Sequence, residues 1–266
     1  MTPTDPSQWW RTAIINMQPG VIELRGAPIE TLIGEVSFVD MIWRMVVGTP
    51  ASAEQLRVLE AALVAAVDHG PQAPSVAAAR MAATCGVGLN NALATGVNML
   101  GDVHGGAGQQ CVALMNSVIN EVDRGASVEA AVASVVGAFQ TEVSVFVPGF
   151  GHRFHRPKDP RAEPLLAVLE ATDDEAIDRR YGQVARAIQA QVSEGKSTAI
   201  AINIDGATAA LYGALGLAPE LARGLFCLSR SVGILAHAWE QTQQGGRNKG
   251  PLPPEFLWTY TGPKAG

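Results

Sequence analysis

The stretch "TPASAEQLRVLEAALVAAV", residues 49–67, predicts the structural class of this 266-residue chain. Ser52 stands three residues before Gln55, which is the spacing of a capping box at the start of a helix. The apolar residues that follow recur at helical intervals and are Leu56, Leu59, Leu63 and Val67. This spacing predicts an α-helix that buries one face.

Other segments carry the same signals. Thr172 and Glu175 form a second capping-box pattern, and the helix that they predict stops at Gly195. Pro219 occupies a first-turn position of a long apolar-periodic segment. Only residues 20–28, "GVIELRGAP", indicate a short extended pair around a glycine turn. The fold class is therefore predicted to be all-α.

Composition excludes several classes of protein. Hydrophobic residues are 47% and charged residues 17%, which favours a compact chain with a large core over a disordered one. A net charge of -6 gives no reason to expect nucleic-acid binding, which needs a clustered basic face. Cys85, Cys111 and Cys227 show no CxxC spacing and indicate buried thiols in a reducing compartment. The first residues, "MTPTDPSQWWRT", lack the apolar core of a signal peptide, so a cytoplasmic location is expected.

The longest charge-free stretch runs over residues 81–101. It is long enough to span a bilayer, but it contains Asn90, Asn91, Asn98 and four glycines. We interpret it as a buried helix pair, and we expect no membrane partner.

Three of the five histidines stand beside glycine: His69 in "VDHGP", His104 in "DVHGGAG" and His152 in "GFGHR". Glycine lets the backbone and a neighbouring side chain approach a ligand closely. Each histidine alone fits a helix cap or a turn, but three such sites favour a binding site. His155 and His237 lack this context and are interpreted as structural.

Other kinds of site fit less well. The three histidines lack the close spacing of zinc motifs, so no metal is expected, and no GxSxG marks a serine nucleophile. "GVGLNNAL" and "HGGAGQQ" lie in helical surroundings rather than after a strand. Asp205 follows an apolar run in "AIAINIDGATAAL", where it fits an ordinary helix N-cap as well as a general base of raised pKa.

Taken together, these stretches resemble the citrate synthase superfamily. Residues 22–52 are similar to its N-terminal signature. Four motifs then follow in family order: "VDHGP", "DVHGGAG", "VPGFGHRFHRPKDPR" and "NIDG". After them, "SRSVGILAHAWEQ" is similar to the family's penultimate helix. The resemblance covers residues 20–262. "DHGP", "NIDG" and the short length are most similar to citryl-CoA lyase and the citrate-synthase-like module of ATP citrate lyase, whereas "VHGGA" is more like citrate synthase itself.

The resemblance implies roles for the conspicuous side chains. His104 would hydrogen-bond the thioester oxygen, His152 would polarise the ketone of the oxo acid, and Asp205 would be the catalytic base. His69 and Arg161 would bind the oxo acid. The residues expected to hold coenzyme A are Val147, Pro148, Gly149, Gly151 and Arg153.

These residue types suit the implied chemistry. Making an enolate from a thioester requires charge stabilisation at its oxygen and a base at its carbon, and arginine's planar fork suits carboxylates. One departure concerns the family's substrate arginine after the "SRSVGILAHAWEQ" run, because Gln243 or Gln244 falls near its position. Either Arg247 takes over this role, or the substrate has one carboxylate fewer or a different shape and Arg247 is a solvated tail residue.

The resemblance implies a large helical domain, residues 1–107 plus 218–266, with a small one, residues 108–217, inserted. It implies a homodimer or larger homo-oligomer whose C-terminal tail reaches the partner's site. The main functional hypothesis is a citryl-CoA lyase, acting on citryl-CoA or a related 3-hydroxy-acyl-CoA, with the CoA thioester as substrate and no permanently bound cofactor. The alternatives are a citrate or 2-methylcitrate synthase type of condensation and a non-catalytic CoA-binding subunit.

Overall fold

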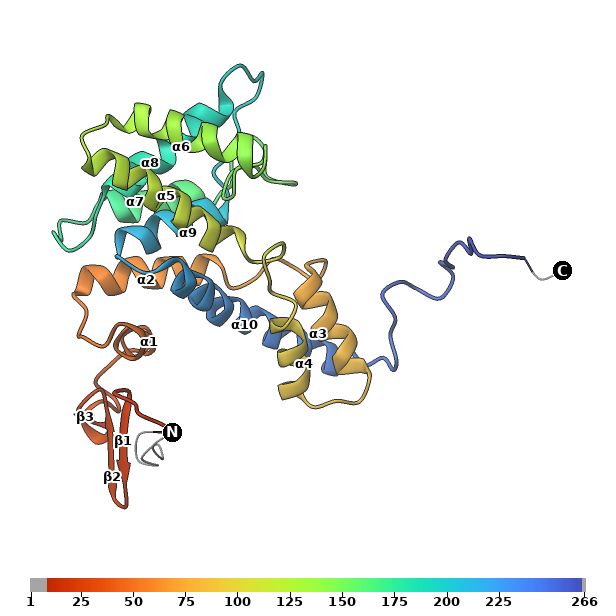
Figure 1. Ribbon diagram of the computed structural model, residues 1–266. Coiled ribbons are helices and arrows are strands. Elements are labelled where there is room, and N and C mark those ends of the chain that lie inside the picture. The colour runs from red at the N-terminus through yellow and green to blue at the C-terminus, as the bar shows by residue number, and fades with distance from the viewer. Residues whose placement is uncertain (1–8, 265–266) are drawn as a thin grey trace, which may run out of the picture.

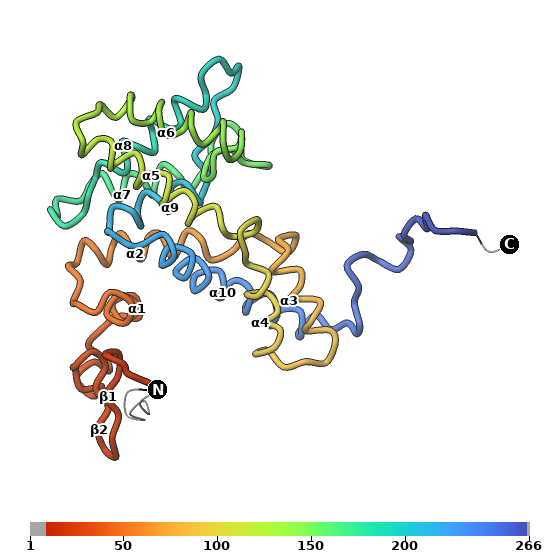
Figure 2. Tube along the Cα trace, in the orientation of Figure 1, coloured from red at the N-terminus to blue at the C-terminus, as the bar shows by residue number. Residues whose placement is uncertain are grey.

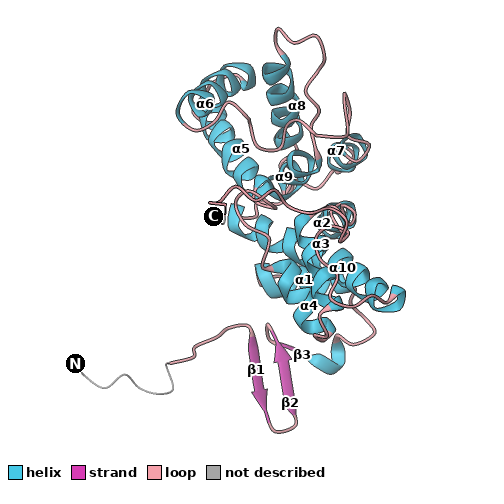
Figure 3. Ribbon diagram, turned by 90° about the vertical axis from the view of Figure 1, so that its right-hand side faces the viewer, coloured by secondary structure: helices cyan, strands magenta, loops and turns pink. Residues whose placement is uncertain are grey.

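The computed structural model describes residues 9–264, and it is mostly helical, as the sequence predicts. Residues 1–8, which belong to the segment expected to lack a signal peptide, lie outside the described residues. The helices form two groups, and two views at right angles separate them in the same way (Figures 1 and 3). No helix within residues 9–264 combines the length and the apolar character that crossing a membrane requires.

One group holds the early helices and the last one. Its members are α1 (Phe38–Val47), α2 (Ala53–Ala65), α3 (Pro74–Thr84), α4 (Leu89–Val97) and α10 (Pro219–Gln244). The other group holds α5 (Ala107–Asp123), α6 (Val128–Glu142), α7 (Ala162–Glu170), α8 (Arg180–Ser193) and α9 (Ile204–Ala214). The trace in Figure 2 shows the chain entering the second group after α4 and returning through α10.

A small antiparallel sheet precedes the helices and projects from them (Figure 1). Its strands are β1 (Ile15–Gln18), β2 (Val21–Leu24) and β3 (Ala27–Pro28), in the order β1-β2-β3, and a 3-10 turn, η2 (Ile29–Thr31), follows. The extended pair predicted over residues 20–28 is confirmed as β2 and β3, which turn at Arg25 and Gly26, both with positive φ. β1 was not anticipated.

The main hydrophobic core surrounds α9. Every residue of this helix is buried except Asp205, because α2, α5, α7 and α8 all pack against it. An alanine-rich helix that is apolar all round suits such a central position. A second, smaller core joins α3, α4 and the later part of α10 through Val76, Ala92 and Ile234.

Packing bears on the proposed domain division. α5 begins at Ala107, close to the expected boundary, and α9 ends at Ala214. However, α2 packs against α7 and α9, so the main core continues across the division between residues 1–107 plus 218–266 and residues 108–217. The division into two domains therefore stays a prediction.

Helix ends test the capping predictions. The Ser52–Gln55 capping box is confirmed at the start of α2, and Pro219 is the first residue of α10. The capping box predicted at Thr172 is wrong, because α8 begins only at Arg180. Asp174 explains the difference: its carboxylate accepts the Ser52 hydroxyl and the Ala176 N–H, which holds this segment in turns.

The charge-free stretch over residues 81–101 contains the end of α3 and all of α4, as predicted. The two helices pack against each other and against α10. α4 buries only one face, since Ala92 and Gly96 are buried while Asn90 and Asn91 are exposed.

α8 and α9 approach each other closely at Gly213, where an added Cβ would collide with the ring of Tyr181. That ring cannot easily move, because it is buried and its hydroxyl donates to Asn116 Oδ1 at 2.7 Å. Gly213→Ala is expected to destabilise the protein by about 1–3 kcal/mol through overpacking.

Thermal unfolding checks this expectation, at roughly 2–4 °C for each kcal/mol. Gly137→Ala in α6 is the matched control, because its Cβ would meet nothing within 4 Å. That variant should gain about 0.5–1 kcal/mol from helix propensity. Equal effects of the two substitutions would contradict the packing at Gly213.

Candidate active site

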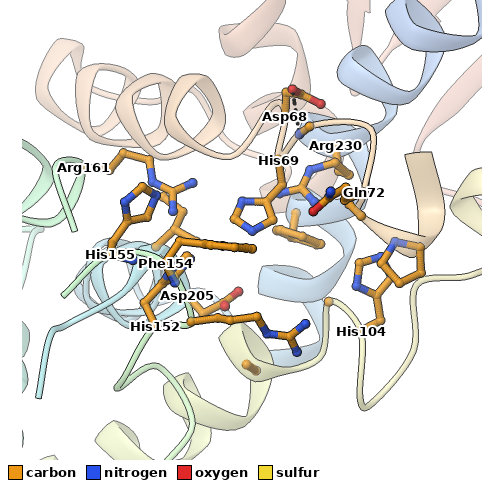
Figure 4. A pocket seen from close by; sticks show the side chains of 18 of the residues that line it. Asp68, His69, Gln72, His104, His152, Phe154, His155, Arg161, Asp205 and Arg230 are labelled. Carbon is orange, nitrogen blue, oxygen red and sulfur yellow. Dashed lines mark hydrogen bonds between the residues drawn. The ribbon is translucent and has the colours of Figure 1, made fainter. Parts of the chain in front are cut away.

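A cavity of about 980 Å³ opens where loops from both helix groups meet α10. Its walls are the loop after α2, the loop before α5, the turn before α7, the first turn of α9 and the middle of α10. Figure 4 shows histidine, arginine and aspartate side chains gathered around it.

Six of the predicted site residues line this cavity: His69, His104, His152, Arg153, Arg161 and Asp205. Val147, Pro148 and Gly149 instead line an adjoining hollow of about 470 Å³, which shares Val103 and Ala107 with the first. Gly151 lines neither hollow.

Arg247 also lies outside both hollows. It is exposed at the start of the C-terminal segment, which leads away from the helices (Figure 1). Gln244, at the end of α10, accepts a hydrogen bond from Arg80.

Backbone contacts join the "GFGHR" turn to the start of α9. The Asn203 N–H donates to the Gly149 carbonyl at 3.0 Å, and the Gly151 N–H donates to the Ala201 carbonyl at 2.7 Å. The Asn203 side chain closes the link by donating to the Gly151 carbonyl at 2.8 Å. A Cβ at Gly206 would collide with the Gly149 carbonyl. Glycine at 206 therefore permits the contact that brings His152 and Asp205 to one wall.

Asn203, not Asp205, is the N-cap of α9. Its side-chain oxygen accepts the N–H groups of Asp205 at 2.9 Å and Gly206 at 3.2 Å. The N-cap interpretation of Asp205 is therefore wrong, and its carboxylate accepts no hydrogen bond from residues 9–264. Burial raises the pKa of this carboxyl, against the opposing effect of Arg230 and Arg161. The group is thus suited to hold and release a proton.

The backbone sets the tautomer of His152. Its Nδ1 lies 3.0 Å from the Phe154 N–H and 2.9 Å from the His155 N–H, and both donate to it. Since Nδ1 accepts, the proton of the neutral ring must be on Nε2. His152 therefore has an N–H donor fixed before any ligand arrives.

Hydrogen bonds fix the other tautomer in His104. Its Nε2 lies 3.2 Å from the Ser75 N–H and 2.9 Å from the Ser75 hydroxyl, at the start of α3. A nitrogen that accepts the backbone N–H is unprotonated, so the proton of the neutral ring is on Nδ1. His104 can then donate from Nδ1 to an oxygen in the cavity.

The His69 loop is supported from α10. Asp68 accepts the Gly70 N–H at 3.0 Å, and its other carboxylate oxygen lies 3.2 Å from His237 Nε2. His237 Nδ1 in turn lies 3.1 Å from an Arg80 nitrogen, which can only donate. His237 is thus partnered on both nitrogens outside the cavity, in agreement with its structural interpretation.

The three cavity imidazoles share one electrostatic trend. Burial lowers the pKa of His69, His104 and His152. Arg230 is the next cause for His69 and His104, and His155 is the next for His152. The rings are therefore neutral at pH 7, as hydrogen-bond donors of defined tautomer need to be.

Two arginines face the cavity, and they differ in whether a carboxylate of the protein pairs with them. The Nε and Nη2 of Arg161 donate to the Asp159 carboxylate at 2.9 and 2.8 Å, which leaves the other edge of the guanidinium for a ligand. Arg230 donates to the Ala66 carbonyl at 3.0 Å and is only 4% exposed. It forms no ion pair with any carboxylate of residues 9–264, so a ligand carboxylate would match it.

Sequence reasoning missed Arg230, Gln72 and the position of His155, all of which line the cavity. Arg230 had a signal: it stands four residues before Ile234 and eight before Ala238, on the buried face of its helix. A charged residue is rarely fully buried unless it is paired, so an arginine on an apolar helix face indicates a partner or a ligand. Within the part of the chain that the structure describes, no three His, Cys, Asp or Glu side chains gather as metal ligands.

Comparison with known proteins identifies relatives over most of the chain. The family model "Citrate synthase, C-terminal domain" matches residues 22–250. The citrate synthase of Haloferax volcanii is 31% identical over 182 residues, covering 68% of this chain and 45% of that protein. The chain spans about half the length of the curated relatives that it matches.

Solved structures show the same fold. The citryl-CoA lyase of Hydrogenobacter thermophilus superposes with a TM-score of 0.84 at 28% identity, covering 97% of this chain and 96% of that one. The ATP citrate lyase of Methanosaeta concilii superposes with a TM-score of 0.80 at 17% identity, covering 98% of this chain and 45% of that one. The second likeness concerns the fold alone.

The raised pKa of Asp205 predicts a stability gain on removing its charge. Because the folded-state pKa lies above the unfolded value of about 3.9, ionisation costs stability as the pH rises past that value. Asp205→Asn should raise the melting temperature at pH 8 and leave it nearly unchanged at pH 3, where both forms are neutral.

Thermal unfolding at the two pH values measures the effect. Asp173→Asn is the control, since Asp173 is fully exposed and its long ion pair with Arg179, at 3.9 Å, should contribute little to stability. A melting temperature for Asp205→Asn that stays equal to or below that of the parent protein at pH 8 would contradict the desolvated carboxyl.

Proposed function

The chain belongs to the citrate synthase family, and from this premise we propose that it is an acyl-CoA carbon–carbon lyase of the citryl-CoA lyase type. The reaction would cleave citryl-CoA, or a related 3-hydroxy-acyl-CoA, to acetyl-CoA and an oxo acid such as oxaloacetate. The observation that carries the proposal is the convergence of His104, His152 and Asp205 on one cavity. The likeness to a citryl-CoA lyase over 96% of its length supports it further.

In this proposal each histidine acts in the tautomer described above, and Asp205 acts as an acid of raised pKa. The hydroxyl of the substrate gives its proton to solvent water beside His152, whose Nε2–H stays hydrogen-bonded to that oxygen. The carbon–carbon bond then breaks, and its electron pair passes to the acetyl-CoA enolate. The proton that Asp205 afterwards gives to the enolate carbon is restored from solvent. The enolate oxygen of the departing acetyl-CoA accepts the Nδ1–H of His104. Protonated Asp205 then gives its proton to the enolate carbon, and its raised pKa favours this protonated state.

Substrate carboxylates would bind to fixed cations. Arg230 and the free edge of Arg161 face the cavity, and His69 lies beside His152 with ring centroids 5.5 Å apart. Coenzyme A would enter through the adjoining hollow at Val147, Pro148 and Gly149. The CoA thioester is a substrate here, and no permanently bound cofactor is part of the proposal.

The alternative is a citrate or 2-methylcitrate synthase type of condensation, which the names of the curated relatives favour. The same groups would run the reverse reaction, with Asp205 as base at the acetyl carbon and His152 donating to the ketone. The two functions differ in whether the thioester of citryl-CoA is hydrolysed. Incubation with oxaloacetate and acetyl-CoA separates them, because prompt release of free CoA thiol would reject a pure lyase.

Asp205→Asn is expected to lower kcat for citryl-CoA cleavage by roughly 10²–10⁴-fold, because the variant cannot transfer the proton. Its affinity for CoA should stay close to that of the parent protein, since the CoA hollow is not lined by this side chain. Cleavage rates and calorimetric CoA binding measure the two effects. Unchanged cleavage would reject catalysis by Asp205. A parent protein that binds CoA but shows no cleavage would favour a non-catalytic CoA-binding subunit.

The proposed assembly is a homodimer in the cytoplasm. α10 carries an exposed apolar stripe opposite its packed face, at helical spacing, formed by Leu228, Val232, Leu235 and Trp239. A second copy of the chain would cover this stripe. The C-terminal segment, apolar and exposed at Leu252, Phe256, Leu257, Trp258 and Tyr260, would then reach the partner and bring Arg247 to its cavity. All three cysteines are free thiols, which suits a reducing compartment, but the expectation that all are buried is wrong, because Cys85 is exposed and Cys227 is half-buried.

The dimer predicts a specific effect of charge on the stripe. Val232→Glu should shift the mass in solution from twice 27.9 kDa to a single chain, because a carboxylate would be buried without a partner. Light scattering after size exclusion measures the mass. Ala133→Glu, on the exposed side of α6, is the control and should leave the dimer intact. A dimer that persists in Val232→Glu would place the interface elsewhere.

A further inference from the structure

A chain of hydrogen bonds runs from the last turns of α10 to the loop that carries His69. It joins three side chains that are far apart in the sequence: Arg80 of α3, His237 of α10 and Asp68 of the loop. Arg80 Nη1 lies 3.1 Å from His237 Nδ1, and His237 Nε2 lies 3.2 Å from one carboxylate oxygen of Asp68. The other oxygen of Asp68 accepts the Gly70 N–H at 3.0 Å. The chain therefore ends on the backbone beside His69.

The arginine fixes the direction of this chain. A guanidinium can only donate, so His237 Nδ1 accepts and carries no proton. The proton of the ring is therefore on Nε2, which donates to Asp68. Burial opposes the ionisation of Asp68, but the hydrogen bonds from Gly70 and His237 lower the pKa of this carboxyl, so it can accept from both.

Arg80 is itself held in place by α10. Its Nη1 donates to Glu240 at 2.6 Å, and its Nη2 donates to Gln244 at 2.6 Å. His237, Glu240 and Gln244 stand at helical spacing, so one face of α10 presents all three acceptors. The orientation of the guanidinium is therefore set from three positions on one helix.

α10 also touches the loop directly. A Cβ at Gly233 would collide with the Val67 carbonyl, and it would come within 3.0 Å of Asp68 Oδ1. Gly233 stands one helical turn before His237. The loop therefore lies against α10 where Gly233 leaves room, and the His237 ring holds it there.

The position of the His69 ring depends on this support. The ring meets the His152 ring edge to face, with centroids 5.5 Å apart, but its nitrogens form no hydrogen bond among residues 9–264. Its place in the cavity is therefore set by the backbone of its own loop, which Asp68 anchors.

We propose that Arg80 and His237 are positioning residues for His69, and that they act through Asp68 to set the affinity of the cavity for the oxo acid. Neither Arg80 nor His237 lines the cavity or the adjoining hollow. Their effect on binding is therefore indirect. The inference rests on the proposed function, which makes His69 a ligand of the oxo acid.

Two substitutions of His237 test the hydrogen bonds separately from the packing. His237→Leu removes both ring nitrogens and should lower the affinity for oxaloacetate about 3–10-fold, the equivalent of one neutral hydrogen bond. His237→Gln should stay within about twofold of the parent protein, because its amide offers an acceptor to Arg80 and a donor to Asp68. Calorimetry on the full chain measures these affinities. The affinity for CoA should be the same in all three proteins, since its hollow lies elsewhere.

Hydrogen exchange of the backbone over residues 67–72 provides a readout that needs no ligand. His237→Leu should speed the exchange of this segment, and His237→Gln should not. Arg80→Met breaks the chain at its other end and should also speed the exchange, which keeps the test open if His237→Leu does not fold. Arg124→Met is the matched control, because Arg124 is exposed and pairs with Glu121, away from the loop.

Two results would overturn the positioning role. One is an affinity and an exchange rate in His237→Leu equal to those of the parent protein. The other is an equal loss in His237→Gln, which would show that the shape of the imidazole matters and its hydrogen bonds do not. A parent protein that binds no oxaloacetate, with or without CoA, would instead reject the proposed oxo-acid site, and the effect on affinity would fall with it. Faster exchange in His237→Leu would then still support the ordering of the loop by Arg80 and His237.

Discussion

The arrangement of the cavity depends on one backbone contact, between the glycine turn that ends at Gly151 and the first turn of α9. Gly206 lies against the Gly149 carbonyl, and an added Cβ at Gly149 would meet Cys111 Sγ and the Gly206 backbone. Hydrogen bonds between the two segments hold them at this distance. Because both segments are short and rigid here, His152 and Asp205 have a defined separation although more than fifty residues lie between them.

Around this contact, hydrogen bonds within the protein fix which ring nitrogen of each donor histidine carries the proton before a substrate binds. Backbone N–H groups hold Nδ1 of His152, and Ser75 holds Nε2 of His104. Donors that are oriented before the substrate binds need no reorganisation during the reaction. The same burial that lowers the pKa of these rings raises that of Asp205, so removal from water favours the neutral forms of both acid and base. These buried polar groups make the folded protein less stable than apolar side chains at the same positions would. Such a loss of stability is common where function requires buried polar groups.

Several features could be predicted from local sequence. The capping box at Ser52 and the position of Pro219 depend only on neighbouring residues, and both are confirmed. The pattern at Thr172 was equally local, but Asp174 bonds to Ser52 on another helix and α8 starts later. Arg230 shows the same limit in the site: its place on a helix was visible, but the exposure of its guanidinium to a cavity was not.

The sequence by itself determined that the chain is helical, which glycine turns carry histidine, and which family it belongs to. The helical class and the glycine turns follow from short-range spacing, because helix periodicity, caps and turns are set within a few residues. The family follows from the resemblance of several motifs in their order along the chain. Only the tertiary structure decided that six of the predicted residues share one cavity, that Arg247 lies outside it, and that His155 lies inside it. Whether a side chain faces a cavity depends on packing between segments far apart in the chain, and no local pattern records that packing.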